Sequence, residues 1–215
     1  MQLDPNRPVG FESRKSYARR CREGFWDAFV AGGAVLDIGY RGGLPDALTI
    51  VPGAIGIEPD HVRISDDRIE PWASSGPNSY DGLHLPANDG QMDTIHASHV
   101  LEHLTTPTEY LREWHRVIRL SGNLIVIVPH AYLYERRLTV PPSRWSPEHL
   151  RSFTPGSLLE LIEEAFEPNS YQVSALFTDD TGYDYSLPLD VHPTGVLEIV
   201  MVLRKIAKPQ WNVEP

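Results

Sequence analysis

Hydrophobic residues along the chain gather in short runs that alternate with amphipathic segments. Six apolar runs bounded by glycine, proline or polar residues predict buried strands, at 34–38, 54–58, 92–98, 124–128, 171–177 and 196–203. Three segments with apolar residues at helical spacing predict helices, at 13–30, 107–120 and 157–166. This order, closed by a pair of strands, predicts an α/β fold with a mostly parallel sheet, helices on both faces and an antiparallel edge.

The other segments lack a clear period. Residues 1–12 are expected to form a loose arm, and any helix in the proline-containing crossover between the first two strands is expected to be short. Residues 59–92 are rich in Pro, Gly, Ser, Asn and Asp, which predicts mostly irregular chain with a weak strand near Tyr80. The chain is therefore divided into an N-terminal arm and helix over 1–33 and a domain over 34–215.

Composition narrows the class of protein. The length of 215 residues fits one domain, and 41 % hydrophobic with 22 % charged residues is ordinary for a soluble chain. No apolar run approaches the ~20 residues that cross a bilayer. The single cysteine, Cys21, rules out an internal disulfide framework and favours the cytoplasm. A formal net charge of −10 disfavours nucleic acid and membranes as partners and favours a small molecule or an uncharged glycan.

A glycine-rich turn follows the first predicted strand. It contains Gly39, Arg41 and Gly43, and Glu58 comes 19 residues after Gly39, at the end of the second strand. In an open parallel sheet, ligands bind at the carboxyl ends of the strands. Glycines there let a ligand approach the backbone, and an acid at Glu58 can accept hydrogen bonds from a ribose diol. The turn alone also fits a tight turn in any α/β protein.

A series of segments follows that turn in order: Leu85-Pro86, Asp93, Glu102-His103-Leu104, Arg116-Val117-Ile118, and Ser121-Gly122 before a strand. With the turn, the series resembles the small-molecule branch of the class I methyltransferases that use S-adenosylmethionine, over about residues 34–166. The resemblance implies a Rossmann-like, seven-stranded methyltransferase sheet whose last two strands form an antiparallel hairpin. It also implies S-adenosylmethionine as cofactor and S-adenosylhomocysteine as product.

The same resemblance implies roles for individual residues. Near the cofactor it places Asp37, Gly39 and Gly43 at the methionine end, Glu58 at the ribose, Asp81, Gly82 and Leu83 at the adenine, and Ser98 with His99 near the sulfonium. The family usually has glycine where this chain has Arg41. The Arg41 guanidinium must therefore point away from the cofactor or pair with its carboxylate.

The C-terminal part is expected to supply the substrate side, through an insert at about 130–156 and a loop over 178–195. Segments such as Pro142-Ser143-Arg144-Trp145 and Gly182-Tyr183-Asp184 are similar to a bacterial subgroup linked to cell-surface sugars. That similarity implies a sugar hydroxyl or amine as acceptor. The candidate substrate residues are Arg144, Trp145, His149, Tyr183 and Asp184. A packed lid corner and a solvated acidic loop remain alternative interpretations of these segments.

The expected reaction is methyl transfer to oxygen or nitrogen, which needs alignment of the nucleophile and, for a hydroxyl, a base. His99 and His130 follow neighbouring strands at the ligand-binding edge, so each is a candidate catalytic base or a hydrogen-bonding residue only.

Other interpretations are weaker. His99 and His103 have the spacing of a zinc-protease helix, but the segment is better explained by the methyltransferase series, and no metal is expected. Arg19, Arg20 and Arg22 are expected on the solvated face of the first helix, with Cys21 in the core. A binding or scaffold protein that has lost turnover, a nicotinamide-linked enzyme and a homodimer stay open.

Overall fold

The computed structural model describes residues 4–10, 12–40, 47–59, 62–65, 68–71, 79–80, 83–85, 87–136 and 143–209. Four residues with predicted cofactor roles lie outside this part of the chain: Arg41, Gly43, Asp81 and Gly82. For Glu58 the backbone is described.

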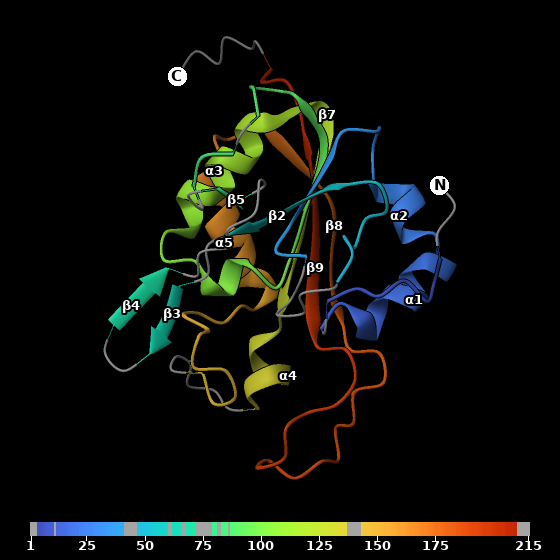
Figure 1. Cartoon of the computed structure of the whole chain (residues 1–215), viewed down its shortest axis with the longest axis vertical. Helices are drawn as coiled ribbons and strands as arrows, with labels where there is room; N and C mark the ends of the chain where they lie inside the picture. The colour runs from blue at the N-terminus through green and yellow to red at the C-terminus, as the bar shows by residue number, and fades with distance from the viewer. Residues whose placement is uncertain are drawn as a thin grey trace.

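The main sheet runs in the order β5–β2–β1–β6–β7–β9–β8 (Figure 1). Its strands are β1 (Val35–Ile38), β2 (Ile55–Pro59), β6 (Met92–Ser98), β7 (Ile118–Pro129), β8 (Tyr171–Asp179) and β9 (Glu198–Lys205), with the two-residue β5 (Ser79–Tyr80) paired to β2. All pairings from β5 to β7 are parallel, and β9 is antiparallel to both of its neighbours. The prediction of a mostly parallel sheet closed by an antiparallel pair is confirmed.

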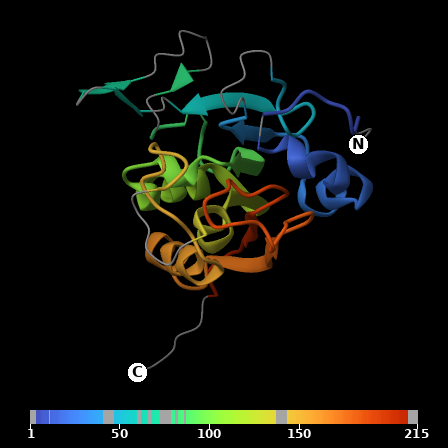
Figure 2. The same ribbon diagram turned by 90° about the horizontal axis from the view of Figure 1, so that it is seen from below.

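Two groups of helices pack on the sheet. On one face, α3 (Pro107–Val117) and α5 (Pro155–Ala165) bury Trp114 and Leu158 against strand residues such as Val126. On the other, α1 (Arg14–Arg22) and α2 (Phe25–Phe29) bury Tyr17 and Trp26 with Ile125 (Figure 2). Strands β7 and β9 are buried over most of their length because side chains on both of their faces are covered.

Helix ends follow local chemistry. The predicted helix over 13–30 is two helices, because Gly24 adopts a left-handed φ of 73° and ends the first. Helix α5 begins at Pro155, earlier than predicted, because the side chain of Thr154 caps it by accepting a 3.1 Å hydrogen bond from the Ser157 amide. Two short segments complete the helical elements: η1 (Leu101–His103) and α4 (Ala131–Glu135).

Two predictions for irregular segments are wrong. Within 59–92, β5 confirms the weak strand expected near Tyr80, but β3 (Val62–Ser65) and β4 (Arg68–Pro71) form an antiparallel pair that was not expected. Strands of four residues are too short to distinguish from loops by pattern. The N-terminal arm is docked rather than loose. Val9 is fully buried, and Arg7 Nε donates a 2.7 Å hydrogen bond to the Thr49 carbonyl.

The crossover between β1 and β2 is described over residues 39–40 and 47–54, and these residues contain no helix. The expectation of a short crossover helix stays a prediction. In the described part of the chain, no helix combines the length and apolar character needed to span a membrane.

Candidate active site

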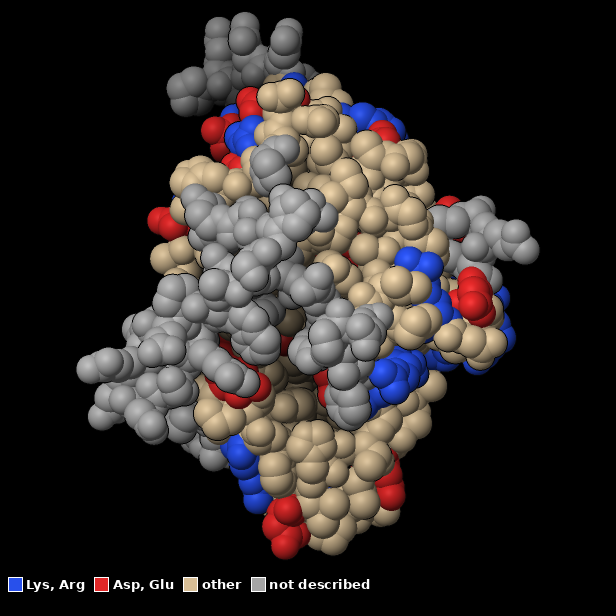
Figure 3. Space-filling model, viewed as in Figure 1, with Lys and Arg blue, Asp and Glu red and all other residues tan. Residues whose placement is uncertain are grey.

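The ends of five strands converge on one edge of the sheet. Gly39 follows β1, His99 follows β6 and His130 follows β7. Because β9 runs in the opposite direction, its first residue, Glu198, lies at the same edge, opposite Asp179 of β8. In the space-filling view, acidic side chains border a hollow on this face (Figure 3).

The glycine turn has the geometry that a closely bound ligand requires. Gly39 has a φ of 70°, and a Cβ added to it would lie 2.2 Å from Val100 Cγ2. Its amide donates a 2.8 Å hydrogen bond to the Ile57 carbonyl of β2. The register that pairs Ile38 with Ile57 therefore places Gly39 beside the backbone of Glu58. A left-handed glycine next to an acid at a strand end fits a nucleoside-containing cofactor.

The Asp37 side chain contacts the chain segment that leads from this turn to β2. Its side chain is fully buried, and both carboxylate oxygens are occupied by contacts with other residues of the chain. One oxygen, Oδ1, lies 2.8 Å from His96 Nδ1. The other, Oδ2, accepts hydrogen bonds from the amides of Ile50 and Val51. The carboxylate thus satisfies two backbone amides of the crossover near the start of β2.

His99 is held between two carboxylates. Its Nε2 lies 2.9 Å from Glu198 Oε1, and its Nδ1 lies 3.5 Å from Glu102 Oε1. Burial would lower the pKa of His99, but its close contacts with the Glu102 and Glu198 carboxylates and the charges of these groups outweigh it and raise the pKa to about 10. An imidazolium cannot accept the proton of an acceptor, so this environment disfavours His99 as the base that the sequence predicts and favours a charged, structural role near neutral pH.

The carboxylate partners of His99 are correspondingly acidic. Burial would raise the pKa of Glu198, but the charge of Arg20 and the hydrogen bond from His99 lower it to about 2. Burial would also raise the pKa of Glu102, which His99 and His103 lower to about 2. Both carboxylates are therefore charged although neither is more than 3 % exposed.

Arg20 joins helix α1 to this edge. Its Nη2 donates hydrogen bonds of 2.9 Å to Asp179 Oδ2 and 2.6 Å to Glu198 Oε2, and Arg19 also pairs with Asp179. The prediction of a solvated arginine face is wrong for Arg20, which is 2 % exposed. Sequence reasoning missed the Arg20, Asp179 and Glu198 cluster. An available signal was Glu198, a charged residue next to a continuous apolar run.

Ser98 directly precedes His99 at the end of β6, and His130 follows the neighbouring strand β7. Ser98 is buried, and its Oγ lies 3.2 Å from the Oγ of Ser13, the residue that precedes α1. His130 is partly buried, burial lowers its pKa, and Nδ1 has no hydrogen-bond partner on another described residue. Its imidazole is therefore neutral near pH 7 and is not held by a carboxylate.

The insert and the long loop contact each other. The Arg144 guanidinium lies 4.8 Å from the centre of the Trp145 ring and donates a 2.6 Å hydrogen bond to the Leu189 carbonyl. Tyr183 Oη donates a 3.1 Å hydrogen bond to the Leu133 carbonyl. Arg136 Nη1 donates to the Pro188 carbonyl. These contacts hold the loop against the insert, which we call the lid: residues 131–136, 143–154 and 180–197.

Two other predicted substrate residues are placed differently. Asp184 Oδ1 accepts hydrogen bonds from the amide and the hydroxyl of Ser186, which lower the pKa of this exposed carboxyl group. His149 packs against the rings of Tyr134 and His103, and burial lowers its pKa. His149 thus lies with η1 at the inner side of the lid, whereas the Asp184 carboxylate closes a turn at the surface.

Comparison with known proteins agrees with this geometry. The sequence profile of a family described as methyltransferase domain matches residues 11–165. A "probable S-adenosylmethionine-dependent methyltransferase" of Mycolicibacterium smegmatis is 28 % identical over 131 residues, which cover 60 % of this chain and 47 % of that protein. The chain therefore spans about half the length of this curated relative.

Two solved structures share the fold. One is 1,6-didemethyltoxoflavin-N1-methyltransferase of Burkholderia thailandensis, with 1,6-didemethyltoxoflavin and S-adenosylhomocysteine bound. It has a TM-score of 0.52 at 16 % identity and is matched over 91 % of this chain and 80 % of that chain. The other is the cyclase SpnF, which has a TM-score of 0.56 at 16 % identity. The match covers 95 % of this chain and 86 % of SpnF. The same fold is therefore found in proteins that catalyse different reactions. Because the family profile covers more than half of its length, the chain belongs to the methyltransferase domain family.

Proposed function

We propose that this chain is an S-adenosylmethionine-dependent methyltransferase that acts on an oxygen or nitrogen of a small polar acceptor, such as a sugar. The observation that carries the proposal is the left-handed Gly39 turn beside the backbone of Glu58 at the carboxyl ends of parallel strands. The family match over 11–165 supports it, because that range contains both strand ends.

Bound S-adenosylmethionine supplies a methyl carbon that its positive sulfonium makes electrophilic. By resemblance to the family, Gly39 and Gly43 would hold the methionine end, with Arg41 paired to its carboxylate. Glu58 would hold the ribose hydroxyls, and Ser98 would lie near the reacting centre. Asp81, Gly82 and Leu83 would lie at the adenine.

His130 is the base in this proposal. Its imidazole is neutral near pH 7 because burial lowers its pKa, and no carboxylate competes for its ring. A neutral imidazole at the end of β7 can accept the proton of an acceptor hydroxyl. His99 would instead supply a fixed positive charge, balanced by Glu198 and Glu102, that orients the edge of the site.

The lid would bind the acceptor and exclude water from it. Arg144 stacked on Trp145 offers a flat face with hydrogen-bond donors, which suits the ring and hydroxyls of a sugar. Tyr183 lies on the loop that Arg136 and Arg144 hold in place. Excluding water favours transfer to the aligned acceptor.

The test is formation of S-adenosylhomocysteine, measured by mass spectrometry, from S-adenosylmethionine and a panel of sugars and sugar nucleotides. With a sugar whose hydroxyl group is methylated, we expect His130→Gln to lower the rate about 100- to 10,000-fold without weakening S-adenosylhomocysteine binding. We also expect the rate of the unaltered chain to fall as the pH drops below the ordinary histidine range, where His130, whose pKa burial lowers, becomes protonated. His115→Gln, a histidine change on α3, is the control.

Full activity of His130→Gln would place the base elsewhere. Turnover with other small molecules but with none of the sugars would contradict the proposed acceptor class.

A further inference from the structure

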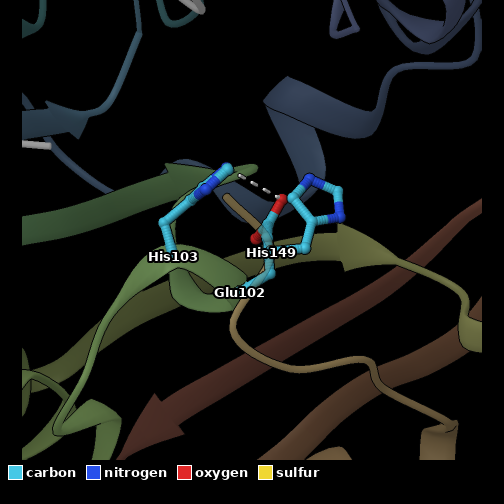
Figure 4. Close-up of side chains that lie close together, drawn as sticks. All are labelled: Glu102, His103 and His149. Atoms are coloured by element: carbon cyan, nitrogen blue, oxygen red, sulfur yellow. Dashed lines mark ion pairs between the residues drawn. The ribbon is translucent and has the colours of Figure 1, made fainter. Parts of the chain in front are cut away.

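We propose that Glu102, His103 and His149 bind a divalent transition-metal ion, of the zinc or cobalt class, at the inner side of the lid. One ligand atom from each of the three residues lies within 4.8 Å of the others, and Figure 4 shows the Glu102 carboxylate close to both imidazole rings. Bonds to such a metal are about 2.0–2.2 Å, so two ligand atoms on one ion are at most about 4.4 Å apart. Small side-chain rotations therefore close the site.

The Glu102 carboxylate is the most buried of the three ligands. Its side chain is 1 % exposed, and neither oxygen has a hydrogen-bond partner in the described part of the chain. The nearest imidazole nitrogens, His99 Nδ1 and His103 Nε2, are 3.5 and 3.8 Å from Oε1. Buried carboxylates are normally satisfied by close hydrogen bonds or a metal, so this one lacks part of its expected surroundings.

His103 is oriented as a metal ligand. Its Nδ1 lies 3.1 Å from the carbonyl oxygen of Glu148 and donates to it, and Nε2 is the ring nitrogen that faces Glu102. Metal-binding histidines commonly donate their second ring nitrogen to a backbone carbonyl in this way. The fold therefore orients Nε2 toward the proposed ion.

Two backbone segments build the site together. Leu150 donates its amide to the carbonyl of Glu102, at 2.9 Å, which ties the lid segment carrying His149 to η1. The His149 ring is 4.9 Å from that of His103 and 5.1 Å from that of Tyr134 on α4. All three ligands are thus fixed by main-chain or ring contacts.

The ligand set indicates the class of metal. Two imidazoles and one carboxylate favour zinc and neighbouring transition metals over magnesium and calcium, which prefer oxygen ligands. Three protein ligands leave a coordination position open, as in sites that bind a further molecule. The zinc-protease spacing of His99 and His103 does not form this site, because 101–103 is a single 3-10 turn and His99 pairs with Glu198. This inference goes beyond methyl transfer, because the ion can bind without turnover.

The experiment uses the untagged full chain, freed of metal with a chelator that is then removed. Cobalt(II) is titrated while its visible absorption is recorded, and zinc is titrated by calorimetry. We expect one equivalent to bind, and we expect Glu102→Gln, His103→Gln and His149→Ala each to weaken binding at least ~10-fold. His115→Ala is the matched control and should bind as the unaltered chain does.

Two outcomes would overturn the site: no binding of either metal, or binding that the three ligand variants do not weaken. Circular dichroism checks the fold of each variant. If Glu102→Gln does not fold, the metal affinity of His149→Ala decides whether the site exists, because His149 is only partly buried and belongs to the lid. The binding of S-adenosylhomocysteine, measured on the metal-free chain, tests the proposed methyltransferase separately.

Discussion

His99 Nε2 lies 2.9 Å from Glu198 Oε1, and this pair joins the end of β6 to the start of β9. Glu102 of η1 faces the other ring nitrogen, and Arg20 of α1 faces the other oxygen of Glu198. Positive and negative groups from four elements therefore alternate along one edge of the sheet. The arrangement makes the stability of the fold depend on pH.

The first prediction concerns that pH dependence. Folding raises the pKa of His99 from 6.5 to about 10, so its contribution to stability is complete below pH 6.5 and is lost as the pH rises toward 10. Folding lowers the pKa of Glu198 from 4.5 to about 2, so its contribution is complete above pH 4.5 and is lost as the pH falls toward 2. The pair therefore stabilises the fold most between pH 4.5 and 6.5.

Urea unfolding of the metal-free chain at a series of pH values, with chelator present, checks this prediction. We expect the free energy of unfolding to fall between pH 6.5 and 10, and the fall to be much smaller in His99→Gln. His115→Gln is the control, because burial lowers the pKa of His115 and its loss cannot remove an alkaline decline. An equal alkaline decline in His99→Gln and the unaltered chain would show that the pair is not its source.

The second prediction concerns the anchor of α1. Arg20→Met keeps the bulk of the side chain but leaves two buried carboxylates, Asp179 and Glu198, short of a positive partner. We expect it to lower the free energy of unfolding by about 3–5 kcal/mol. The exposed Arg22 of the same helix is the control, and Arg22→Met should change stability by about 0.5 kcal/mol or less. Equal effects of the two changes in urea unfolding would mean that the buried ion pairs do not hold α1.

The third prediction concerns the glycine turn. Gly39→Ala places a Cβ where Val100 Cγ2 lies and imposes a left-handed φ on alanine. We expect a loss of about 1–3 kcal/mol in the free energy of unfolding and weaker cofactor binding. Gly33→Ala is the control, since nothing lies within 4 Å of its added Cβ.

A second change separates the two causes at Gly39. Val100→Ala removes the colliding methyl group, so it should recover part of the stability that Gly39→Ala loses, and the remaining loss reports the backbone conformation. A Gly39→Ala chain as stable as the unaltered one would refute the steric argument.

Much of the fold could be predicted because the signals are local. Strand β6 matches the predicted 92–98, and α3 begins at the predicted Pro107, where an apolar stripe and a proline at the first position act together. The helix break at Gly24 was not predicted, because the helical spacing of apolar residues continues across it. The left-handed backbone of Gly24 nevertheless ends the first helix.

The site was less predictable because its contacts are distant in sequence. Arg20 meets Asp179 and Glu198 across 159 and 178 positions, and no local pattern distinguishes a buried arginine from the solvated ones beside it. Likewise, His149 reaches Glu102 only because the lid folds back onto η1. The strand ends marked the edge of the sheet correctly, but the partners that set the charge of His99 came from other segments.

Calorimetric titration with S-adenosylhomocysteine tests the central claim most directly. We expect the unaltered chain to bind it with micromolar affinity. Glu58→Gln should weaken binding about 10- to 100-fold through loss of charged hydrogen bonds to the ribose, whereas Glu163→Gln on the exposed face of α5 should not. Absence of binding at millimolar concentration would contradict the account and favour a methyltransferase-like fold that serves as a binding protein.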